Sequence, residues 1–408
     1  MRILLVGGGS GGHVTPLVAI ARELHYLKPQ NTQIRLWTDK KFAKQTCQLA
    51  PKFAEVEIIA SGKLRRYANL NFFYKYFSWY HITHTHLPNL RDIFKIAFGF
   101  AQSFAKLRSW RPDVIFCKGG YVCLPVGLAA HCLKIPLVIH DSDTVPGLTN
   151  RVLARFAIAI GTGAPVENYP NYPSAITRFV GIPVRPEFAK LSSREREANK
   201  RKLGLDPAKK LIFVAGGGGG ATIFSSIFAK IAPDIIKKFD VQIFLLTGKG
   251  KGFAVSDLVK SGPSSLRNDI EHNFIVREFL ADEYPQLLNA CDVFVTRAGA
   301  TSMAEAAASE TATIIVPSPF LAGDHQTKNA AIFAKADAAI VLKQNQTDDH
   351  FDDKLAREMS ENLESLLGDR GDKLRLKLGE NLANFAKKDA LENIANMIIA
   401  AATTKEKL

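Results

Sequence analysis

The feature that most constrains the fold is a unit that occurs twice: an apolar strand, a glycine-rich loop and a helix. In the first copy, Gly7 to Pro16 join a strand at 3–6 to a helix expected to begin near Pro16. In the second, Gly216 to Gly220 join a strand at 211–215 to a helix at 221–231. Glycine lets a ligand approach the backbone closely, and a helix start presents unpaired N–H groups. Each copy therefore predicts a site for an anion or a polyhydroxyl ligand.

Short apolar strands alternate with helical segments along the rest of the chain. Further strands are expected at 33–37, 114–117, 136–140, 242–247, 274–276, 293–296 and 313–316. This alternation is typical of an α/β fold with parallel sheets covered on both faces. The 408 residues suit two Rossmann-like domains, expected at 1–183 and 184–385, with the C-terminal helix packing back on the first. We expect a cleft between them, which suits group transfer.

The charge of the chain favours a polyanionic partner. The formal net charge is +14, which indicates either nucleic acid or an anionic membrane surface. Residues 61–110 carry thirteen aromatic residues, eight Lys or Arg and a single acid, Asp92. Aromatic rings with a basic border suit a membrane interface. The residues predicted to contact the membrane are Phe73, Lys75, Phe77, Trp79, Arg91 and Lys95.

Two other interpretations of this segment remain open. It could be a core helix with a solvated basic face, or it could stack on RNA bases. No RNA-binding signature accompanies it, so we expect no nucleic-acid partner. The five cysteines show no Cys-x-x-Cys spacing and an odd count, which favours a reducing cytoplasm. We expect neither an export signal nor a membrane-spanning segment.

Several polar residues follow predicted strands, where sites in parallel sheets lie. They are His13, Tyr121 and the run His140-Asp141-Ser142-Asp143. A histidine is a suitable general base for a sugar hydroxyl, and Asp141 is the rival candidate. An ordinary dinucleotide turn with a solvated histidine is the alternative, in which Asp39 would be the ribose-binding acid. Asp141 and Asp143 spell Asp-x-Asp, but no further cluster of metal ligands is apparent, so we predict no metal site.

The second half offers groups for a nucleotide sugar. The Gly216–Gly220 loop could hold a diphosphate, with Arg185 supplying positive charge. Glu305, expected near a helix start, could accept two ribose hydroxyls, although capping of that helix is the alternative. His325 and Gln326 could contact sugar hydroxyls, or could simply be solvated. No Walker motif follows either glycine loop, which makes phosphoryl transfer from ATP an unfavoured hypothesis.

Taken together, these segments resemble the MurG family of N-acetylglucosaminyltransferases, part of glycosyltransferase family 28. The resemblance spans both predicted domains in the same order. It rests on Gly8–Pro16, Ser61–Tyr67, Gly119–Val122, Gly147–Asn150, Gly181–Arg185, Arg297–Ala300 with Glu305, and Asp324–Gln326 with Asn329-Ala330.

The resemblance implies a GT-B fold and an inverting hexosyltransferase of peptidoglycan synthesis. The enzyme would transfer N-acetylglucosamine from UDP-N-acetylglucosamine to the C4 hydroxyl of the muramyl sugar of lipid I, giving lipid II. It would be cytoplasmic and peripheral on the inner face of the cytoplasmic membrane, with other cell-wall enzymes as candidate partners. The resemblance implies no permanently bound cofactor, and a divalent cation is an option that it does not require.

The resemblance also assigns roles to residues of this chain. Phe279 and Leu280 would receive the uracil, Glu305 the ribose, and His325 with Gln326 the N-acetylglucosamine. The remaining donor-binding residues would be Ser10, Gly11, Gly12, Asp143, Arg185, Gly217, Gly218, Gly219, Ala300, Thr301, Ser302, Met303 and Ala304. The first glycine turn, with His13, would also face the acceptor, whose other contacts would be Thr15, Tyr121 and Asn150.

Two departures from the family pattern bear on these roles. The family commonly has His-Glu-Gln-Asn where this chain has His140-Asp141-Ser142-Asp143. An added carboxylate close to a diphosphate is unfavourable unless a cation offsets it. In the second loop, Gly216–Gly220 lacks the serine hydroxyl that the family commonly has there. Two other hypotheses therefore stay open: a related transferase that uses another lipid acceptor, and a catalytically weak UDP-sugar-binding scaffold of the cell-wall machinery.

Overall fold

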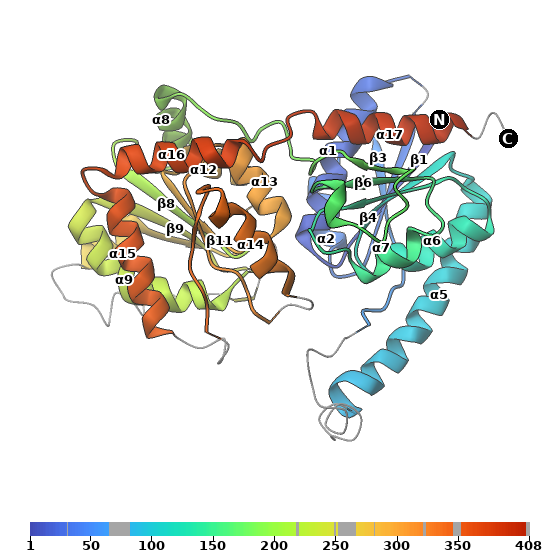
Figure 1. The fold of residues 1–408 in the computed structure, drawn as a ribbon, viewed down its shortest axis with the longest axis horizontal. Helices are drawn as coiled ribbons and strands as arrows, with labels where there is room; N and C mark the ends of the chain where they lie inside the picture. Colours follow the sequence, from blue (N-terminus) through green and yellow to red (C-terminus); the bar gives the residue numbers. More distant parts are fainter. Residues whose placement is uncertain are drawn as a thin grey trace. The chain divides into compact units, whose positions relative to one another are not determined.

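The computed structural model describes residues 1–30, 32–64, 82–217, 220–248, 250–251, 267–280, 282–320, 324–345 and 352–404. The chain divides into two compact units. Unit 1 comprises Met1–Pro183 and Lys387–Leu408, and unit 2 comprises Val184–Ala386. Within each unit, a parallel sheet is covered by helices on both faces (Figure 1). The predicted α/β class with parallel sheets is confirmed.

The sheet of unit 1 has the strand order β3-β2-β1-β4-β5-β6-β7. Its strands are β1 (Arg2–Gly7), β2 (Gln33–Thr38), β3 (Ala54–Ile58), β4 (Val114–Gly119), β5 (Leu137–Asp141), β6 (Ala159–Thr162) and β7 (Thr177–Phe179). Its helices are α1 (Gly11–Leu27), α2 (Ala43–Leu49), α5 (Leu87–Trp110), α6 (Cys123–Cys132), α7 (Leu148–Leu153) and α17 (Ala390–Thr404), with the short η1 (Ile82–His86) and η2 (Val166–Asn168).

Alternation along the strands builds two cores on the two faces of this sheet. On β1, Leu4 and Val6 pack with residues of α5, α6 and α7, whereas Ile3 and Leu5 pack with α1 and α17. A strand whose side chains point alternately to two buried faces must be apolar throughout. This is why the pattern of residues 3–6 and 114–117 predicted the strands correctly.

Helix α1 begins at Gly11, so the prediction that it begins near Pro16 was wrong. The turn itself is short, because β1 ends at Gly7 and Ser10 is the N-cap residue of the helix. Val14 and Leu17 are completely buried, and this packing outweighs the poor intrinsic helix propensity of the two leading glycines. As a result, His13 lies in the first turn of α1 and not in a loop.

The sheet of unit 2 has the order β10-β9-β8-β11-β12-β13. The strands are β8 (Lys210–Ala215), β9 (Val241–Leu246), β10 (Phe274–Arg277), β11 (Val293–Thr296), β12 (Thr313–Ile315) and β13 (Ile340–Val341). The helices are α8 (Ser193–Lys202), α9 (Thr222–Phe239), α11 (Arg267–Asn273), α12 (Glu283–Ala290), α13 (Ala300–Ala308), α14 (His325–Lys335), α15 (Asp353–Leu367) and α16 (Gly371–Ala383).

In each sheet, successive strands of the chain are first added on one side of the first strand and then on its other side. In unit 1 the reversal lies between β1 and β4, and in unit 2 between β8 and β11. Open parallel sheets bind ligands outside the carboxyl ends of the strands at such a point. The two glycine loops follow β1 and β8, so each loop lies at the switch point of its own sheet.

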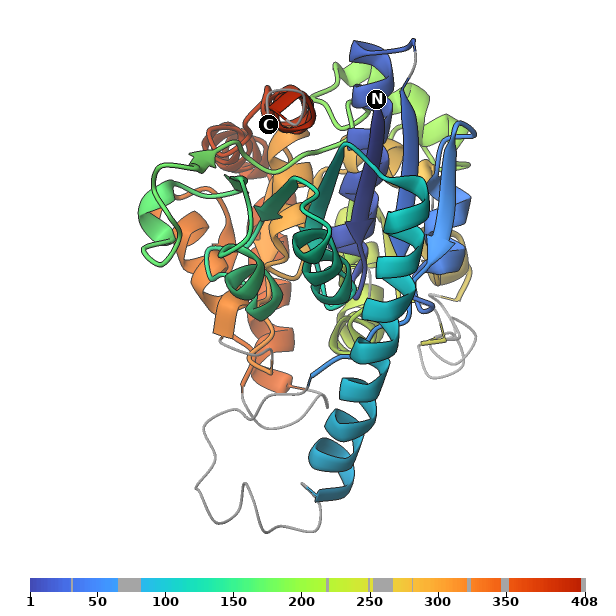
Figure 2. The ribbon, with the colours of Figure 1, turned by 90° about the vertical axis from the view of Figure 1, so that its right-hand side faces the viewer.

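Helix α5 extends beyond the sheet of unit 1 in the side view (Figure 2). Its second half packs into the unit through Phe100, Phe104 and Leu107. Its first half instead exposes large apolar side chains to solvent, namely Leu87, Leu90, Ile93, Phe94 and Phe98. Within α5, the interpretation as a core helix therefore holds for the second half and not for the first, whereas residues 65–81 of the same segment lie outside those described.

Candidate active site

His13 is held in one tautomer by the glycine turn. Its Nδ1 lies 2.9 Å from the carbonyl oxygen of Gly8 and 2.9 Å from Oγ of Ser10. Because a carbonyl oxygen can only accept, Nδ1 must carry the hydrogen and donate it. The lone pair of the neutral ring is then on Nε2. An added Cβ on Gly119 would lie 3.0 Å from this Nε2, and the φ of Gly119 is +126°, so a side chain at this point would crowd the ring and strain the backbone.

The surroundings also keep His13 uncharged. Burial and the positive charge of Lys118 lower the pKa of His13 to about 4, although the Gly8 carbonyl and the carboxylates of Asp143 and Asp39 oppose this. An imidazole that is neutral near pH 7, with its lone pair on a defined nitrogen, has the form that a general base requires. The alternative of an ordinary solvated histidine does not fit this environment.

Asp39 braces the glycine turn. Its Oδ2 accepts a hydrogen bond of 2.6 Å from the N–H of Gly9, and its Oδ1 accepts one of 2.8 Å from the N–H of Lys41. An added Cβ on Gly8 would lie 2.3 Å from Oδ2. The carboxylate is 3% exposed and is already engaged by the backbone. This arrangement does not suit the ribose-binding role that a dinucleotide-binding fold would give Asp39.

The run after β5 is fixed by buried hydrogen bonds. Oδ2 of Asp141 accepts from the Tyr172 hydroxyl at 2.8 Å and from the N–H of Gly147 at 3.1 Å. Burial raises the pKa of Asp141 to about 6. Nε2 of His140 donates to the Gly181 carbonyl oxygen at 2.8 Å. Asp141 is therefore anchored as a structural acceptor, which makes it a weaker candidate for the base than His13.

The residues predicted to contact the acceptor gather around the same turn, although two of them face the protein. The Thr15 hydroxyl donates to the Gly11 carbonyl oxygen at 2.7 Å, within its own helix. Nδ2 of Asn150 donates to the His140 carbonyl oxygen at 2.9 Å. The ring of Tyr121 packs on Gly9, where an added Cβ would lie 2.9 Å from it. Burial and the nearby Asp39 raise the pKa of Tyr121.

Lys118 was not among the predicted site residues, yet it lies in this cluster. It is 1% exposed, and its ammonium group donates to Oγ of Ser142. A sequence signal was available, since Lys118 is the only charged residue in the apolar run that forms β4 and it directly precedes Gly119-Gly120. Strand pairing aligns Gly7 with Gly119, which brings the end of β4 beside the first glycine turn.

In unit 2, two of the predicted donor residues, Arg185 and Glu305, are buried ionisable groups close enough for the charge of Arg185 to act on Glu305. Both are less than 10% exposed. Burial raises the pKa of Glu305 to about 8, and the charge of Arg185 acts against this rise. Nε of Arg185 finds no hydrogen-bond partner among the described residues. A buried donor without a partner is costly, so this nitrogen is available to an incoming acceptor.

The position of Glu305 corrects one expectation. It lies in the second turn of α13, and the first turn contains no acidic residue, so the capping interpretation was wrong. Thr301, Ser302 and Ala304 are partly exposed in the first turns, whereas the Met303 side chain is 1% exposed in the core. Only the backbone of Met303 could meet a ligand.

The other predicted donor residues also follow strand ends or begin helices. Gly217 has a φ of +75°, whereas Gly218 and Gly219 lie outside the described residues. Phe279 and Leu280 follow β10 and are half-buried. His325 is the first residue of α14. Oε1 of the next residue, Gln326, accepts from the N–H of Ser318 at 2.9 Å, so it braces the preceding loop.

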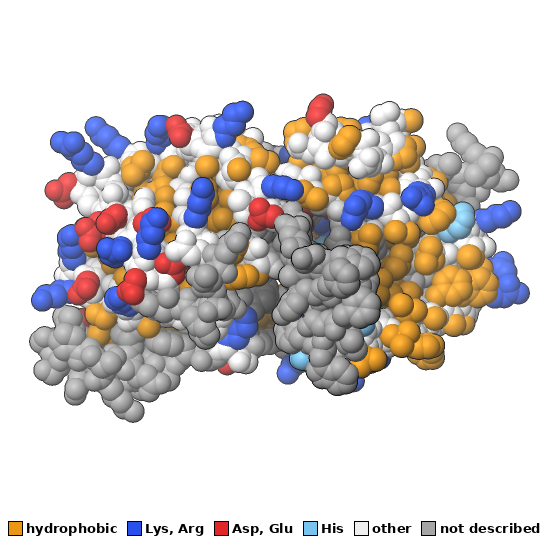
Figure 3. Space-filling model, turned by 60° about the horizontal axis from the view of Figure 1, so that its bottom comes forward, with side chains coloured by type: hydrophobic (Ala, Val, Ile, Leu, Met, Phe, Trp, Pro, Cys, Tyr) orange, Lys and Arg blue, Asp and Glu red, His pale blue; other side chains and the backbone are white. Residues whose placement is uncertain are grey.

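The predicted membrane residues are only partly covered by the structure. Phe73, Lys75, Phe77 and Trp79, like Arg65 to Tyr67 of the family motif, lie outside the described residues. Arg91 and Lys95 are on α5, where both reach the buried carboxylate of Asp92, at 3.1 and 3.6 Å. Figure 3 shows hydrophobic side chains gathered on the right-hand part, with Lys and Arg around them. Among the described residues, no helix is long and apolar enough to cross a membrane.

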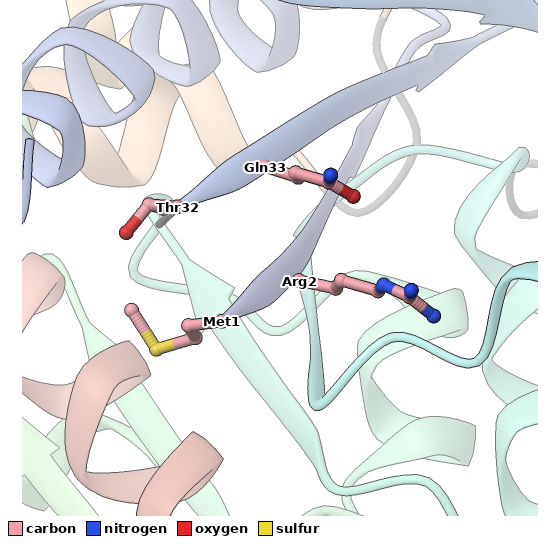
Figure 4. A pocket seen from close by; sticks show the side chains of 4 residues that line it. All are labelled: Met1, Arg2, Thr32 and Gln33. Carbon is pink, nitrogen blue, oxygen red and sulfur yellow. The ribbon is translucent and has the colours of Figure 1, made fainter. Parts of the chain in front are cut away.

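Two further features are not part of this site. A hollow of about 240 Å³ is lined by Met1, Arg2, Thr32 and Gln33 (Figure 4). It lies at the starts of β1 and β2, opposite the strand ends that carry the glycine turn. Within the described ranges, no group of three or more His, Cys, Asp or Glu could hold a metal ion.

Comparisons with known proteins agree across the chain. Residues 3–162 match the glycosyltransferase family 28 N-terminal domain, and residues 211–383 match the C-terminal domain of that family. Two curated relatives are named UDP-N-acetylglucosamine–N-acetylmuramyl-(pentapeptide) pyrophosphoryl-undecaprenol N-acetylglucosamine transferase. The one from Halalkalibacterium halodurans is 32% identical and the one from Natranaerobius thermophilus is 30% identical, each covering 85% of this chain and 87% of the relative.

Solved structures show the same fold. The crystal structure of Acinetobacter baumannii MurG aligns with a TM-score of 0.63 at 20% identity, over 98% of this chain and 99% of that one. The calicheamicin glycosyltransferase CalG4 aligns with a TM-score of 0.59 at 14% identity, over 99% and 98%. The predicted fold of two Rossmann-like domains, of the GT-B type, is thereby confirmed.

Proposed function

The chain belongs to glycosyltransferase family 28, and on that premise we propose that it transfers N-acetylglucosamine from UDP to lipid I. The products are lipid II and UDP. The observation that carries the proposal is the 32% identity, over most of both chains, to a relative whose name states this reaction. The neutral His13 at the switch point of unit 1 and the buried Arg185 and Glu305 of unit 2 support it.

The reaction assigns a step to each group. Nε2 of His13 accepts the proton of the C4 hydroxyl as that oxygen attacks the anomeric carbon of N-acetylglucosamine. The bond from this carbon to the diphosphate oxygen breaks with inversion, and UDP leaves with the electron pair. A positioned base of this kind contributes about 10²–10⁴-fold to a rate.

The donor is held by unit 2. We assign the diphosphate to the N-terminal ends of α9 and α13, where the helix dipoles favour an anion, and to the backbone of Gly217. Arg185 Nε gains a phosphate oxygen as its partner, and its charge stabilises the leaving diphosphate. Glu305 accepts the ribose hydroxyls, Phe279 and Leu280 receive the uracil, and His325 with Gln326 contacts the sugar. We assign no permanently bound cofactor to this reaction.

A transfer assay with two acceptors tests the function. Labelled UDP-N-acetylglucosamine is supplied with a lipid I analogue in one arm and with diacylglycerol in the other, and release of UDP is followed in both. We expect product with lipid I alone. Product with diacylglycerol alone would assign the chain to another lipid acceptor. Binding of UDP without product in either arm would favour a scaffold protein.

We further propose that unit 1 docks on the anionic inner face of the cytoplasmic membrane through α5, where it would also meet other cell-wall enzymes. Phe94 and Phe98 are 68% and 66% exposed on this helix, and the side chains of Arg91 and Lys95, which pair with Asp92 on the same helix, are 61% and 49% exposed. Exposed apolar side chains with a basic border combine apolar burial with attraction to anionic lipid. The net charge of +14 acts in the same direction.

Replacing Phe94 and Phe98 together by serine is expected to reduce co-sedimentation with phosphatidylglycerol vesicles at least about tenfold, because two large side chains no longer enter the lipid. Both side chains are exposed, so the fold should be retained. Leu376→Ser is the matched control, since Leu376 is 60% exposed on α16 of unit 2. Equal sedimentation of the double variant and this control would contradict docking through α5. Replacing Phe73, Phe77 and Trp79 by serine is likewise expected to weaken co-sedimentation with vesicles, although these three residues lie outside those that the structure describes.

A further inference from the structure

A buried lysine lies at the end of β4 with an unusual set of neighbours. Lys118 is 1% exposed, and its Nζ donates to Oγ of Ser142, the residue between the carboxylates of Asp141 and Asp143. A buried ammonium group is tolerated only where it is paired and hydrogen-bonded. Burial lowers the pKa of Lys118 to about 8, and the negative charges of Asp141 and Asp143 oppose this. Lys118 is therefore the cation of this segment.

This cation accounts for the departure of the chain from the family pattern. Asp143 stands where the family commonly has an amide, and an added carboxylate beside a diphosphate-bearing acceptor needs an offsetting charge. Lys118 supplies that charge from the neighbouring strand. The pairing of β4 with β5, with Cys117 opposite Ile139, brings the two segments together.

The same ammonium group acts on His13. The charged and titratable groups around His13 come from several elements. Lys118 on β4 disfavours the imidazolium form, whereas Asp143 after β5 and Asp39 after β2 favour it. A positive charge on His13 would in turn lower the pKa of His140 on β5. Burial lowers the pKa of His13 most, and the positive charge of Lys118 is the next largest cause.

We propose that Lys118 is a positioning residue for the transfer reaction, whose buried charge balances the Asp141–Asp143 segment and, through its hydrogen bond to Ser142, holds that segment beside the first glycine turn. It touches neither sugar, and it acts through His13 and the segment after β5. The inference rests on the proposed role of His13 as the base. Its electrostatic part can be measured without turnover, which separates the two.

The test is the titration of the His13 ring in Lys118→Met, followed by NMR on the full chain, with the resonance identified from its loss in His13→Gln. Removing the positive neighbour is expected to raise the pKa of His13 by about one unit. The acidic limb of the profile of kcat/KM against pH should move to higher pH by the same amount. In Lys118→Arg, which keeps the charge, the His13 ring should titrate as it does in the unchanged protein. Lys106→Met is the matched control, because Lys106 on α5 pairs with Glu57.

A second substitution tests the charge balance. Adding Asp143→Asn to Lys118→Met removes both charges, which act on His13 in opposite directions, so the His13 titration and the acidic limb of the kcat/KM profile should both return close to their original positions. Lys118→Gln, whose amide can still donate to Ser142, provides a neutral variant if the methionine variant does not fold. An unchanged His13 titration in a folded neutral variant would overturn the proposal. A shifted titration in a protein without transferase activity would leave the electrostatics standing and reject the proposed function.

Discussion

Replacing His13 by alanine is expected to lower kcat for N-acetylglucosamine transfer by about 10²–10⁴-fold, because the acceptor hydroxyl then loses the base that removes its proton. The donor should still bind, since its proposed contacts to uracil, ribose and diphosphate are in unit 2. His13→Gln should be equally impaired, because its amide can hydrogen-bond but is not basic. The measurement is single-turnover transfer at saturating donor and acceptor, together with UDP binding by calorimetry.

Asp141→Asn is the control that separates the two candidate bases. An amide oxygen in place of Oδ2 can still accept from Tyr172 and Gly147, so the segment after β5 should keep its position. We expect a loss of less than about tenfold. If this variant lost as much activity as His13→Ala, while His13→Gln kept near-full turnover, Asp141 would be the base.

Replacing Glu305 by glutamine is expected to stabilise the fold and weaken donor binding in the same protein. Burial raises the pKa of Glu305 to about 8 from an ordinary value of 4.5. The folded state therefore loses stability as the pH rises from about 4.5 to about 8, because the unfolded chain gives up its proton first. Glutamine carries no such cost. At pH 8 the free energy of unfolding should rise by about 2–4 kcal/mol.

The affinity of the Glu305→Gln variant for UDP should fall, although its stability rises. A carboxylate has two oxygens that can each accept a ribose hydroxyl, whereas an amide has one, so UDP binding should weaken about 10- to 100-fold. Melting temperatures at pH 4.5 and pH 8 and UDP titrations check both effects. The gain in stability should vanish at pH 4.5. Glu283→Gln, at an exposed site on α12, should change neither quantity, and a destabilised Glu305→Gln protein would contradict the prediction.

The sequence predicted the inner strands of both sheets well because they are buried on both faces. It did not predict β3, β6, β7 and β13, of which β3, β7 and β13 carry exposed or half-buried residues. Segments such as 3–6, 114–117 and 211–215 are apolar throughout, and helices can cover both faces only of a sheet of this kind. The start of α1 was predicted less well. Gly11 and Gly12 have poor helix propensity, and only the three-dimensional packing of Val14 and Leu17 shows why the helix includes them.

Much of the candidate site depends on contacts between residues far apart in sequence. Lys118 stands out as a charge within an apolar strand, but neither this signal nor the surroundings of Asp39 in the sequence states a role, since each residue acts on a segment that only strand pairing brings near it. The Tyr172 hydroxyl that holds Asp141 comes from a loop 31 residues further on. The sequence thus predicts which residues carry the chemistry more readily than which residues tune it.

Helix α17 makes the order of synthesis matter for unit 1. Ile394, Ala395 and Ile398 complete the core formed by Ile3, Leu5 and Leu17, yet the ribosome makes them only after all of unit 2. Until they emerge, α1 alone covers this face of the first sheet and leaves part of its apolar surface exposed, and exposed apolar surface of this kind favours aggregation. Unit 2 can finish folding while unit 1 still waits for its last helix. A nascent chain of this protein is therefore a candidate for chaperone binding throughout the translation of its second half.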